Sequence, residues 1–181
     1  MVEAAQRIHP LAKRVFGGNG VFLNPLEECE RISLRADQDA MAGLGEKIGL
    51  SLPEQPRTSA TSGEVAALWI GPDEWFITAP AGTGLEEKLN TSDSGLYSVV
   101  SIDHRNTGIL VSGSNAVTAL NSGSPRDLSL DAFPVGCCSR TVLAKAEIIL
   151  WRTGEEEFRI ECWRSFSDYV WKYLVDAARS V

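Results

Sequence analysis

The sequence predicts an α+β domain made of two split β-α-β (ferredoxin-like) units, in which helices pack on antiparallel or mixed sheets. Two observations lead to this fold class. Segments that alternate apolar and polar residues, as strands do, recur along the chain, and each group of them precedes a segment with helical apolar spacing. The resulting order is βα, ββα, ββα, βββα, and strands joined through hairpins and helices in this rhythm favour split β-α-β units.

The first strand and helix of this order are well marked. Glu30 to Arg35 alternates apolar and polar residues, Asp37 stands where a helix would begin, and Gly49 stands where it would end. The apolar residues of this helix share one face, and they are Ala40, Met41, Leu44 and Ile48. Ser51 to Gly63, rich in serine and threonine and with two prolines, is expected to be a loop.

A hairpin and a short helix follow. Ala66 to Ile70 and Glu74 to Thr78 are the predicted strands, joined by Gly71-Pro72-Asp73, in which the proline fixes φ and the aspartate can bond its own backbone. Thr83 to Asn90 is the predicted helix.

The middle of the chain repeats this arrangement. Tyr97 to Ile102 and Gly108 to Ser112 are predicted to form another strand pair, and Ser114 is predicted to cap a third helix. Pro125 to Pro134 is expected to be a loop.

Three strands and a long helix are predicted for the last part of the chain. The strands are Thr141 to Ala144, Glu147 to Trp151 and Phe158 to Trp163. Ser165 to Arg179 has the apolar spacing of a helix with one buried face, and Ser165 followed by Asp168 resembles a capping box.

Trp171 and Val175 project beside the apolar stripe of this last helix, so its apolar arc is wider than one core face needs. We interpret the extra width as a second contact surface. Trp171 is the expected anchor of that surface, because tryptophan is enriched at protein interfaces.

The predicted domain organisation is an N-terminal segment, residues 1–29, followed by a single domain, residues 30–181. The domain is interpreted as two degenerate halves, about 30–102 and 103–181, on the order of elements alone. In the N-terminal segment, Gly17-Gly18-Asn19-Gly20 lacks the lysine of a phosphate-binding loop and is expected to be a flexible entry to the domain.

Composition excludes several classes of function. With 17 basic and 24 acidic residues the net charge is -7, which repels a phosphate backbone, so no nucleic acid is expected as a partner. Met1 to Gly18 contains no apolar block, so we expect no signal peptide, no membrane partner and a cytoplasmic location. The four cysteines lack paired C-x-x-C spacing, so we expect reduced thiols and no metal site on this chain.

The cluster Asp103-His104-Arg105 contains the residue types of an acid-base site. Consecutive residues of a strand point to opposite faces, however, so Asp103 and His104 would not pair there, and a structural or interface role is the better interpretation. No serine lies in a G-x-S-x-G elbow. The sequence therefore predicts no catalytic and no cofactor-binding residue.

Several residues are candidates for a partner interface. Arg126 could clamp a carboxylate of folate or of a partner chain, and an internal contact with Asp127 is the alternative. The full set of candidates comprises Trp75, His104, Arg105, Arg126, Phe133, Trp171 and Val175.

Several motifs occur in one recognisable order between about Val65 and the C-terminus. They are Trp69-Ile70-Gly71-Pro72-Asp73-Glu74-Trp75, Asp103-His104-Arg105, Pro125-Arg126-Asp127-Leu128, Ala132-Phe133-Pro134, Leu150-Trp151-Arg152 and Arg164-Ser165-Phe166-Ser167-Asp168-Tyr169. In this order the chain resembles the gamma subunit family of heterotetrameric sarcosine oxidase. It departs from the family's pattern at Ser124, Val135 and Lys145, where cysteine, proline and arginine are expected.

The resemblance implies a companion subunit without a catalytic site, which aids assembly and stability. The implied enzyme is a bacterial complex that oxidatively demethylates sarcosine to glycine, with peroxide and a folate-linked one-carbon product. FAD, covalently attached FMN, NAD, tetrahydrofolate and zinc are implied for the complex, none of them on this chain, and the implied partners are the alpha, beta and delta subunits. The fold would be that of the folate-binding part of glycine-cleavage aminomethyltransferase, and self-association is expected of the isolated chain.

Two other functions stay open on the sequence. One is a freestanding folate-binding module for one-carbon transfer, and the other is an adaptor for unrelated partners. The departures from the family pattern also leave open which N-methyl amino acid the complex would prefer.

Overall fold

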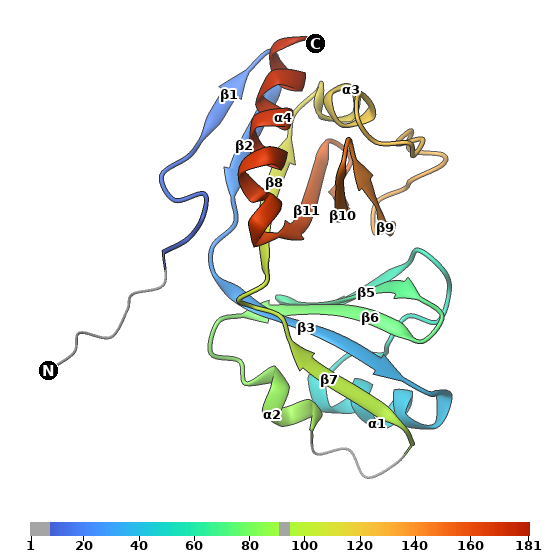
Figure 1. Ribbon diagram of the computed structural model, residues 1–181. Helices are drawn as coiled ribbons and strands as arrows, with labels where there is room; N and C mark the ends of the chain where they lie inside the picture. Colours follow the sequence, from blue (N-terminus) through green and yellow to red (C-terminus); the bar gives the residue numbers. More distant parts are fainter. Residues whose placement is uncertain (1–7, 91–94) are drawn as a thin grey trace, which may run out of the picture.

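The chain folds into four layers, with two antiparallel β-sheets in the middle and helices on both outer sides (Figure 1). The computed structural model describes residues 8–90 and 95–181. Helices α3 and α4 cover one sheet, and α1 and α2 cover the other.

The larger sheet has six strands in the order β1-β2-β8-β11-β10-β9. Its strands are β1 (Phe16–Gly18), β2 (Val21–Pro25), β8 (Asn106–Ser112), β9 (Cys138–Leu143), β10 (Ala146–Gly154) and β11 (Glu157–Trp163). The five-stranded sheet has the order β4-β5-β6-β3-β7. Its strands are β3 (Cys29–Ala36), β4 (Ser59–Ser62), β5 (Val65–Gly71), β6 (Glu74–Pro80) and β7 (Tyr97–Ser101). The helices are α1 (Gln38–Ile48), α2 (Leu85–Leu89), α3 (Ala116–Asn121), the 3-10 turn η1 (Arg164–Phe166) and α4 (Ser167–Arg179).

This arrangement confirms the predicted α+β class with helices packed on antiparallel sheets. The hairpin of β5 and β6 is confirmed, with Ala67 opposite Ile77. Helix α1 begins after Asp37, whose carboxylate accepts a hydrogen bond from the backbone N of Ala40 at 3.0 Å. It ends at Gly49, which adopts the left-handed φ of 72° that glycine tolerates best.

The predicted pairing of the two strands around residues 97–112 is wrong. β7 pairs with β3, whereas β8 lies between β2 and β11 in the other sheet. The turn at residues 103–105 carries the chain from one sheet to the other, so strands that are neighbours in sequence have different partners. Alternation of apolar residues identifies a strand but not the strand it pairs with.

Two segments expected to be irregular contain strands. Asn19 and Gly20, with φ of 51° and 69°, form the two-residue turn of the β1-β2 hairpin, so the interpretation of this stretch as a flexible entry is wrong. Ser59–Ser62 in the expected loop pairs with β5 as β4. Both segments are glycine-rich or polar, and their pairing with neighbouring strands overrides weak local preference.

The predicted helix caps at Ser114 and Ser165 are also wrong. Asn115, whose side chain makes no capping bond, precedes α3, and Phe166 precedes α4. The 3-10 turn η1 displaces the start of α4, and Ser167 Oγ donates to the carbonyl of Arg164 at 2.7 Å. Hydroxyl groups near a helix start can bond in several ways, so a serine alone does not fix the first residue.

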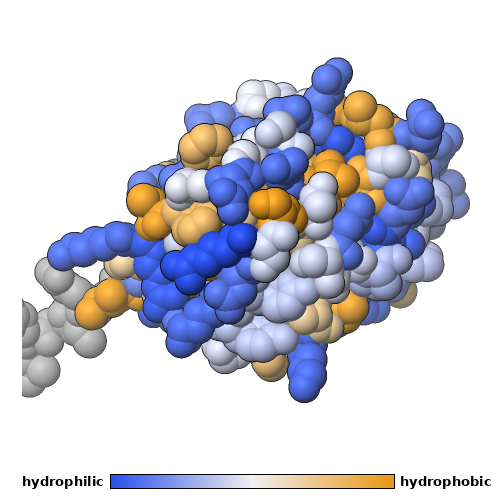
Figure 2. Space-filling view, turned by 90° about the horizontal axis from the view of Figure 1, so that it is seen from above, coloured by the Kyte–Doolittle hydropathy of each residue, from blue (hydrophilic) through white to orange (hydrophobic). Residues whose placement is uncertain are grey.

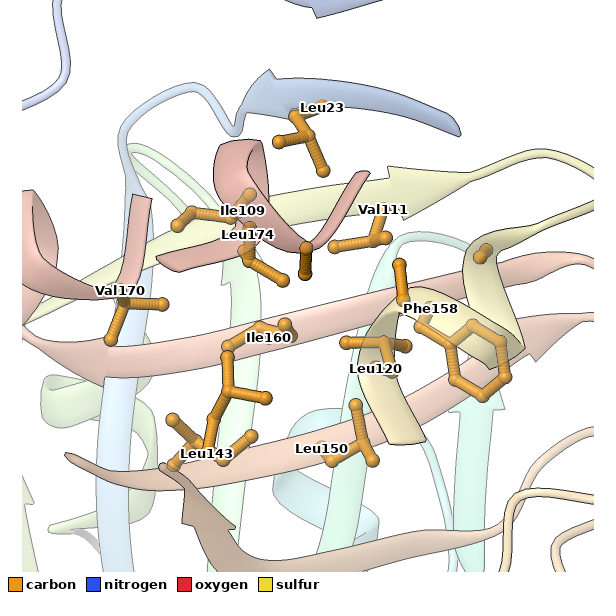
Figure 3. Close-up of a cluster of buried hydrophobic side chains, with 14 of the residues drawn as sticks. Leu23, Ile109, Val111, Leu120, Leu143, Leu150, Phe158, Ile160, Val170 and Leu174 are labelled. Atoms are coloured by element: carbon orange, nitrogen blue, oxygen red, sulfur yellow. The ribbon is translucent and has the colours of Figure 1, made fainter. Parts of the chain in front are cut away.

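The main hydrophobic core lies between the six-stranded sheet and its two helices (Figure 3). Figure 3 shows Leu23 from β2, Ile109 and Val111 from β8, and Leu174 from α4 converging on one cluster. Leu23 comes from the N-terminal segment and is fully buried, so that segment supplies part of this core.

Packing within the chain accounts for the wide apolar arc of α4. Trp171 is 6% exposed and belongs to the main core, and Val175 packs against that core. Helix α4 contacts α3 on one flank and β1, β2 and β11 on the other side, so its apolar arc has several partners within the chain. On the face seen from above, hydrophobic residues form separate patches among hydrophilic ones (Figure 2).

Candidate partner interface

A buried network of charged side chains joins the two sheets. Arg31 Nε lies 2.7 Å from Glu161 Oε2, and Arg159 Nη2 lies 2.6 Å from Glu161 Oε1. The Glu161 side chain is only 1% exposed. Burial alone would lower the pKa of Arg159, but the Glu161 carboxylate and the Cys29 thiol outweigh it and raise that pKa. Both carboxylate oxygens are engaged, so Glu161 is placed to hold the sheets together rather than to move a proton.

A second network of charged side chains lies beside a crevice between the two sheets and is centred on Glu74 of β6. Glu74 Oε1 lies 2.5 Å from Arg140 Nη2, and Glu74 Oε2 lies 3.3 Å from Arg35 Nη2. The crevice beside it, also lined by Glu161, has a volume of about 30 Å³. That volume is near what one water needs and is far below the several hundred Å³ of a pocket for an organic cofactor.

Asp103, His104 and Arg105 form the turn between β7 and β8 rather than a strand. Asp103 Oδ1 accepts a hydrogen bond from the backbone N of Arg31 at 2.5 Å, which fixes this turn against β3. His104 and Arg105 are exposed beside it. The Asp103 carboxylate is thus directed to backbone and does not orient the imidazole as an acid-base pair would require.

Arg105 forms one side of an exposed patch with two aromatic residues. Its guanidinium lies 5.5 Å from the ring centroid of Trp163, and that ring meets Phe166 edge to face at 6.4 Å. Trp163 is 44% exposed and Phe166 is 42% exposed. We call Arg105, Trp163 and Phe166 the aromatic–arginine patch. Arginine and large aromatic residues, the types that form this patch, are enriched at protein–protein interfaces.

Arg126 is exposed in the loop after α3, and its backbone N donates to Ser124 Oγ at 3.3 Å. Its neighbour Asp127 accepts from the backbone N of Ser129 at 2.9 Å, and this bond holds the pKa of Asp127 below its usual value. The carboxylate of Asp127 is therefore engaged with Ser129, which leaves the guanidinium of Arg126 directed at solvent.

Three of the other predicted interface residues are buried in this chain, and the fourth, Val175, is half-buried and packs against the main core. Trp75 is 1% exposed and its Nε1 donates to the carbonyl of Pro53 at 2.8 Å, while Phe133 is fully buried. Like Trp171, these aromatic residues stabilise the fold. Of the predicted set, the structure brings His104 and Arg105 together and leaves Arg126 on a separate loop. Contact with a partner stays a prediction that rests on these exposed residues.

Sequence reasoning missed the arginines that organise the interior. Arg31, Arg159 and Glu161 alternate with apolar residues along their strands, a pattern that predicts a strand but not what its polar face meets. Arg152 was also missed. It is 2% exposed and donates to the carbonyls of Leu128 and Phe133 at 3.0 and 2.8 Å, which secures the loop after α3. Charged residues on strands of both sheets could have signalled a polar layer between them.

The cysteines are all free thiols. Burial raises the pKa of Cys138 to about 12 and that of Cys162 to about 12. In the described residues, no group of three or more histidine, cysteine, aspartate or glutamate side chains is placed to hold a metal ion. Within the same residues, no helix is long and apolar enough to cross a membrane.

The model of the sarcosine oxidase, gamma subunit family matches residues 34–180 of the chain. The chain belongs to this family. Over 163 residues it is 35% identical to the sarcosine oxidase subunit gamma of Corynebacterium sp. (strain P-1), a match that covers 87% of this chain and 79% of the relative. Over 161 residues it is 33% identical to the sarcosine oxidase subunit gamma of an Arthrobacter species, with the same two shares covered.

Solved structures agree with membership of the gamma subunit family. A chain of the heterotetrameric sarcosine oxidase from Corynebacterium sp. U-96 is similar with a TM-score of 0.88 and 27% identity, over 96% of this chain and 95% of that one. Aminomethyltransferase T of the glycine cleavage system from Bartonella henselae is similar with a TM-score of 0.61 at 12% identity, over 86% of this chain and 45% of that one. The second similarity shows the fold alone, and it agrees with the predicted relation to an aminomethyltransferase domain.

Proposed function

We propose that this chain is a companion subunit without an active site, which assembles with the alpha, beta and delta subunits of a heterotetrameric sarcosine oxidase in the cytoplasm. The observation that carries this proposal is the similarity, over nearly the full length of both chains, to a chain of such a heterotetramer. The complex would oxidatively demethylate sarcosine to glycine and release peroxide and a folate-linked one-carbon product. The role of this chain would be to aid assembly and to stabilise the other subunits.

The engagement of the acidic side chains supports a role without catalysis. Glu161 and Glu74 each accept from two arginines, and Asp103 accepts from backbone. A general acid or base needs a carboxyl or imidazole that can reach a substrate and exchange its proton. The crevice of about 30 Å³ between the sheets also does not fit a flavin, NAD or a folate. In line with the family resemblance, we propose that FAD, FMN, NAD, tetrahydrofolate and zinc are held by the other subunits.

The aromatic–arginine patch is the surface that we assign to partner contact, with His104 at its edge. Exposed tryptophan and phenylalanine lose apolar area from water when a partner covers them, and each would contribute about 1–3 kcal/mol. The Arg105 guanidinium keeps its stacking on Trp163 and can pair with a carboxylate of the partner.

Co-purification tests both levels of this proposal. When the tagged chain is purified from the cells that naturally produce it, a yellow assembly with two larger flavoprotein chains and one small chain should be recovered with it. The double variant R105E/F166D should recover much less of it while its thermal unfolding stays unchanged. The matched control is Leu130→Asp, which changes a residue that is 47% exposed on the loop after α3. Full recovery with R105E/F166D would reject the patch, and a colourless lone wild-type chain would reject the subunit assignment.

The folate-module alternative is tested separately by titration of the isolated, folded chain with tetrahydrofolate. No saturable binding is expected up to millimolar ligand, because the proposed role is assembly, and the crevice between the sheets is too small for a pterin. Saturable binding would favour a one-carbon transfer module.

A further inference from the structure

Strand β7 is an open edge of the five-stranded sheet. It is the last strand in the order β4-β5-β6-β3-β7, and among the described residues it pairs only with β3. The backbone N of Asp37 donates to the carbonyl of Leu96 at 2.9 Å, and the backbone N of Ile102 donates to the carbonyl of Arg31 at 2.8 Å. In an antiparallel pair every second residue bonds to the partner strand.

This alternation decides which backbone groups of β7 point away from the sheet. Leu96 bonds to the residue just after β3 and Ile102 bonds to β3, and Ser98 and Val100 are separated from them by two or four residues. The N–H and C=O groups of Ser98 and Val100 therefore also point toward β3. The N–H and C=O groups of Val99 and Ser101 therefore point away from β3, toward the open side of the sheet. Such groups form a template for another strand.

Three of the usual protections of an open edge are missing from β7. Its sequence, Tyr-Ser-Val-Val-Ser, has no charge and no proline, and its register with β3 runs without a bulge. Val100 is 51% exposed and Leu96, just before the strand, is 80% exposed. An uncharged edge with an exposed β-branched valine is suited to the addition of another strand.

The other edge strands differ from β7. β1 has three residues, two of them glycine. β9 carries the charged Arg140, and the backbone N of its first residue, Cys138, donates to the carbonyl of Arg57 at 2.9 Å. β4 has the polar sequence Ser-Ala-Thr-Ser. Among the edges of the two described sheets, β7 is thus the one that has at least five residues and no charged side chain.

We infer that β7 receives an extended segment of another subunit of the assembly, which adds to the five-stranded sheet as a sixth strand. This inference rests on the proposed function and deepens it, because it identifies a second contact besides the aromatic–arginine patch. The segment would exchange backbone hydrogen bonds with Val99 and Ser101 and place an apolar side chain against Val100.

Charge favours a partner segment over a second copy of this chain. Asp37 and Asp39 lie at the Leu96 end of the edge, where Asp37 Oδ2 accepts from the backbone N of Leu96 at 2.8 Å. Two copies paired edge to edge would bring acidic chains of net charge -7 together. An incoming segment with lysine or arginine at the end beside Asp37 would instead gain favourable pairing.

Amide hydrogen exchange tests the inference residue by residue. In the isolated chain the amides of Val99 and Ser101 should exchange quickly, while those of Ser98 and Val100 should be slow, because only the latter donate to β3. In the purified assembly the amides of Val99 and Ser101 should become about 100-fold slower. If they stay fast in a yellow assembly, the strand-addition inference is rejected and the subunit assignment stands.

Two variants supply an independent readout. Val100→Lys places a charge on the edge, and Ser101→Pro removes an outward N–H without removing a bond to β3. Both should lower recovery of the assembly at least about tenfold with unchanged unfolding temperature. The control Val142→Lys changes a residue of β9 that is 41% exposed and should leave recovery unchanged.

The remaining outcomes also decide the question. Wild-type recovery by both edge variants would overturn the inference. Protection of Val99 and Ser101 that rises with concentration of the isolated chain would show that the occupant is a second copy. If no assembly co-purifies with the wild-type chain, the proposed function is rejected, and the inference that β7 receives a strand of another subunit is rejected with it.

Discussion

Arg31 of β3 and Glu161 of β11 connect the two sheets through a distance of 2.7 Å between Nε and Oε2, although the two residues are 130 positions apart in the sequence. Their side chains are 4% and 1% exposed. A second arginine, Arg159, binds the other oxygen of the same carboxylate. Removal of Glu161 would leave two guanidinium groups without their counter-charge between the sheets.

The first prediction concerns this carboxylate. Glu161→Gln should lower the free energy of unfolding by about 3 kcal/mol or more, because breaking a buried ion pair leaves uncompensated buried charge. Glu147→Gln is the matched control, since Glu147 is an exposed carboxylate on the neighbouring strand β10, and it should change stability by less than about 0.5 kcal/mol. Urea unfolding followed by tryptophan fluorescence measures both. Equal effects of the two variants would contradict a structural role for the buried network.

The second prediction tests whether residues 16–25 belong to the folded unit. Leu23 of β2 is fully buried in the main core, whereas its neighbour Phe22 is 53% exposed. Leu23→Ala should cost about 2–5 kcal/mol, and Phe22→Ala should cost much less, because only the first leaves a cavity. Chemical denaturation of both variants measures the difference. A small effect of Leu23→Ala would support the predicted boundary after residue 29.

These examples show what local sequence patterns could and could not predict. The start and end of α1 were predictable because Asp37 and Gly49 act on their own neighbours. The partner of β7 was not, since pairing depends on where the turn at residues 103–105 sends the chain. Burial of Arg31 and Glu161 was hidden for the same reason: a charged residue on a strand faces either water or another sheet, and spacing alone does not distinguish the two.

The candidate interface shows a similar limit. Motif order led to Arg105, and the structure places this arginine against exposed Trp163. Trp171 had the residue type of an interface anchor, but α3 and the sheet surround the face of α4 that carries it. An aromatic residue on a helix contributes apolar area in either setting, so its location needs the neighbouring elements.

The third prediction concerns pH. Asp168 accepts from Lys172 and Arg14, at 2.8 and 2.7 Å, and these hydrogen bonds lower the pKa of the carboxyl below its ordinary value of 3.8. A lowered pKa in the folded state means that the carboxylate stabilises the fold above that ordinary value and loses this effect as pH falls through the folded pKa. Asp168→Asn should therefore unfold at a lower temperature than wild type at pH 7, with a narrower gap at pH 3, below the ordinary pKa of the carboxyl.

Salt supplies the control for this third prediction. Asp168 is exposed, so dissolved ions screen its attraction to Lys172 and Arg14. At 1 M NaCl the Debye length is about 3 Å, and the difference in unfolding temperature at pH 7 should therefore become smaller as well. Calorimetry at the two pH values and two salt concentrations measures all four conditions. A gap as wide at pH 3 as at pH 7 would show that the loss comes from packing rather than from the charge.

The fourth prediction concerns thiol reactivity. In thiol–disulfide exchange the thiolate attacks the disulfide of the reagent, and with a pKa of about 12 Cys138 and Cys162 are almost entirely protonated at pH 8. Cys29 is the one cysteine of the chain that is only half-buried, and it should react first in the folded protein. Cys138 and Cys162 should react only after unfolding in guanidinium chloride, as peptide mapping of the labelled protein will show. In the Cys29→Ser variant the rapid phase of thiol labelling should disappear. Rapid labelling of Cys162 in the folded protein would contradict the prediction and would mean that the six-stranded sheet opens readily next to Glu161.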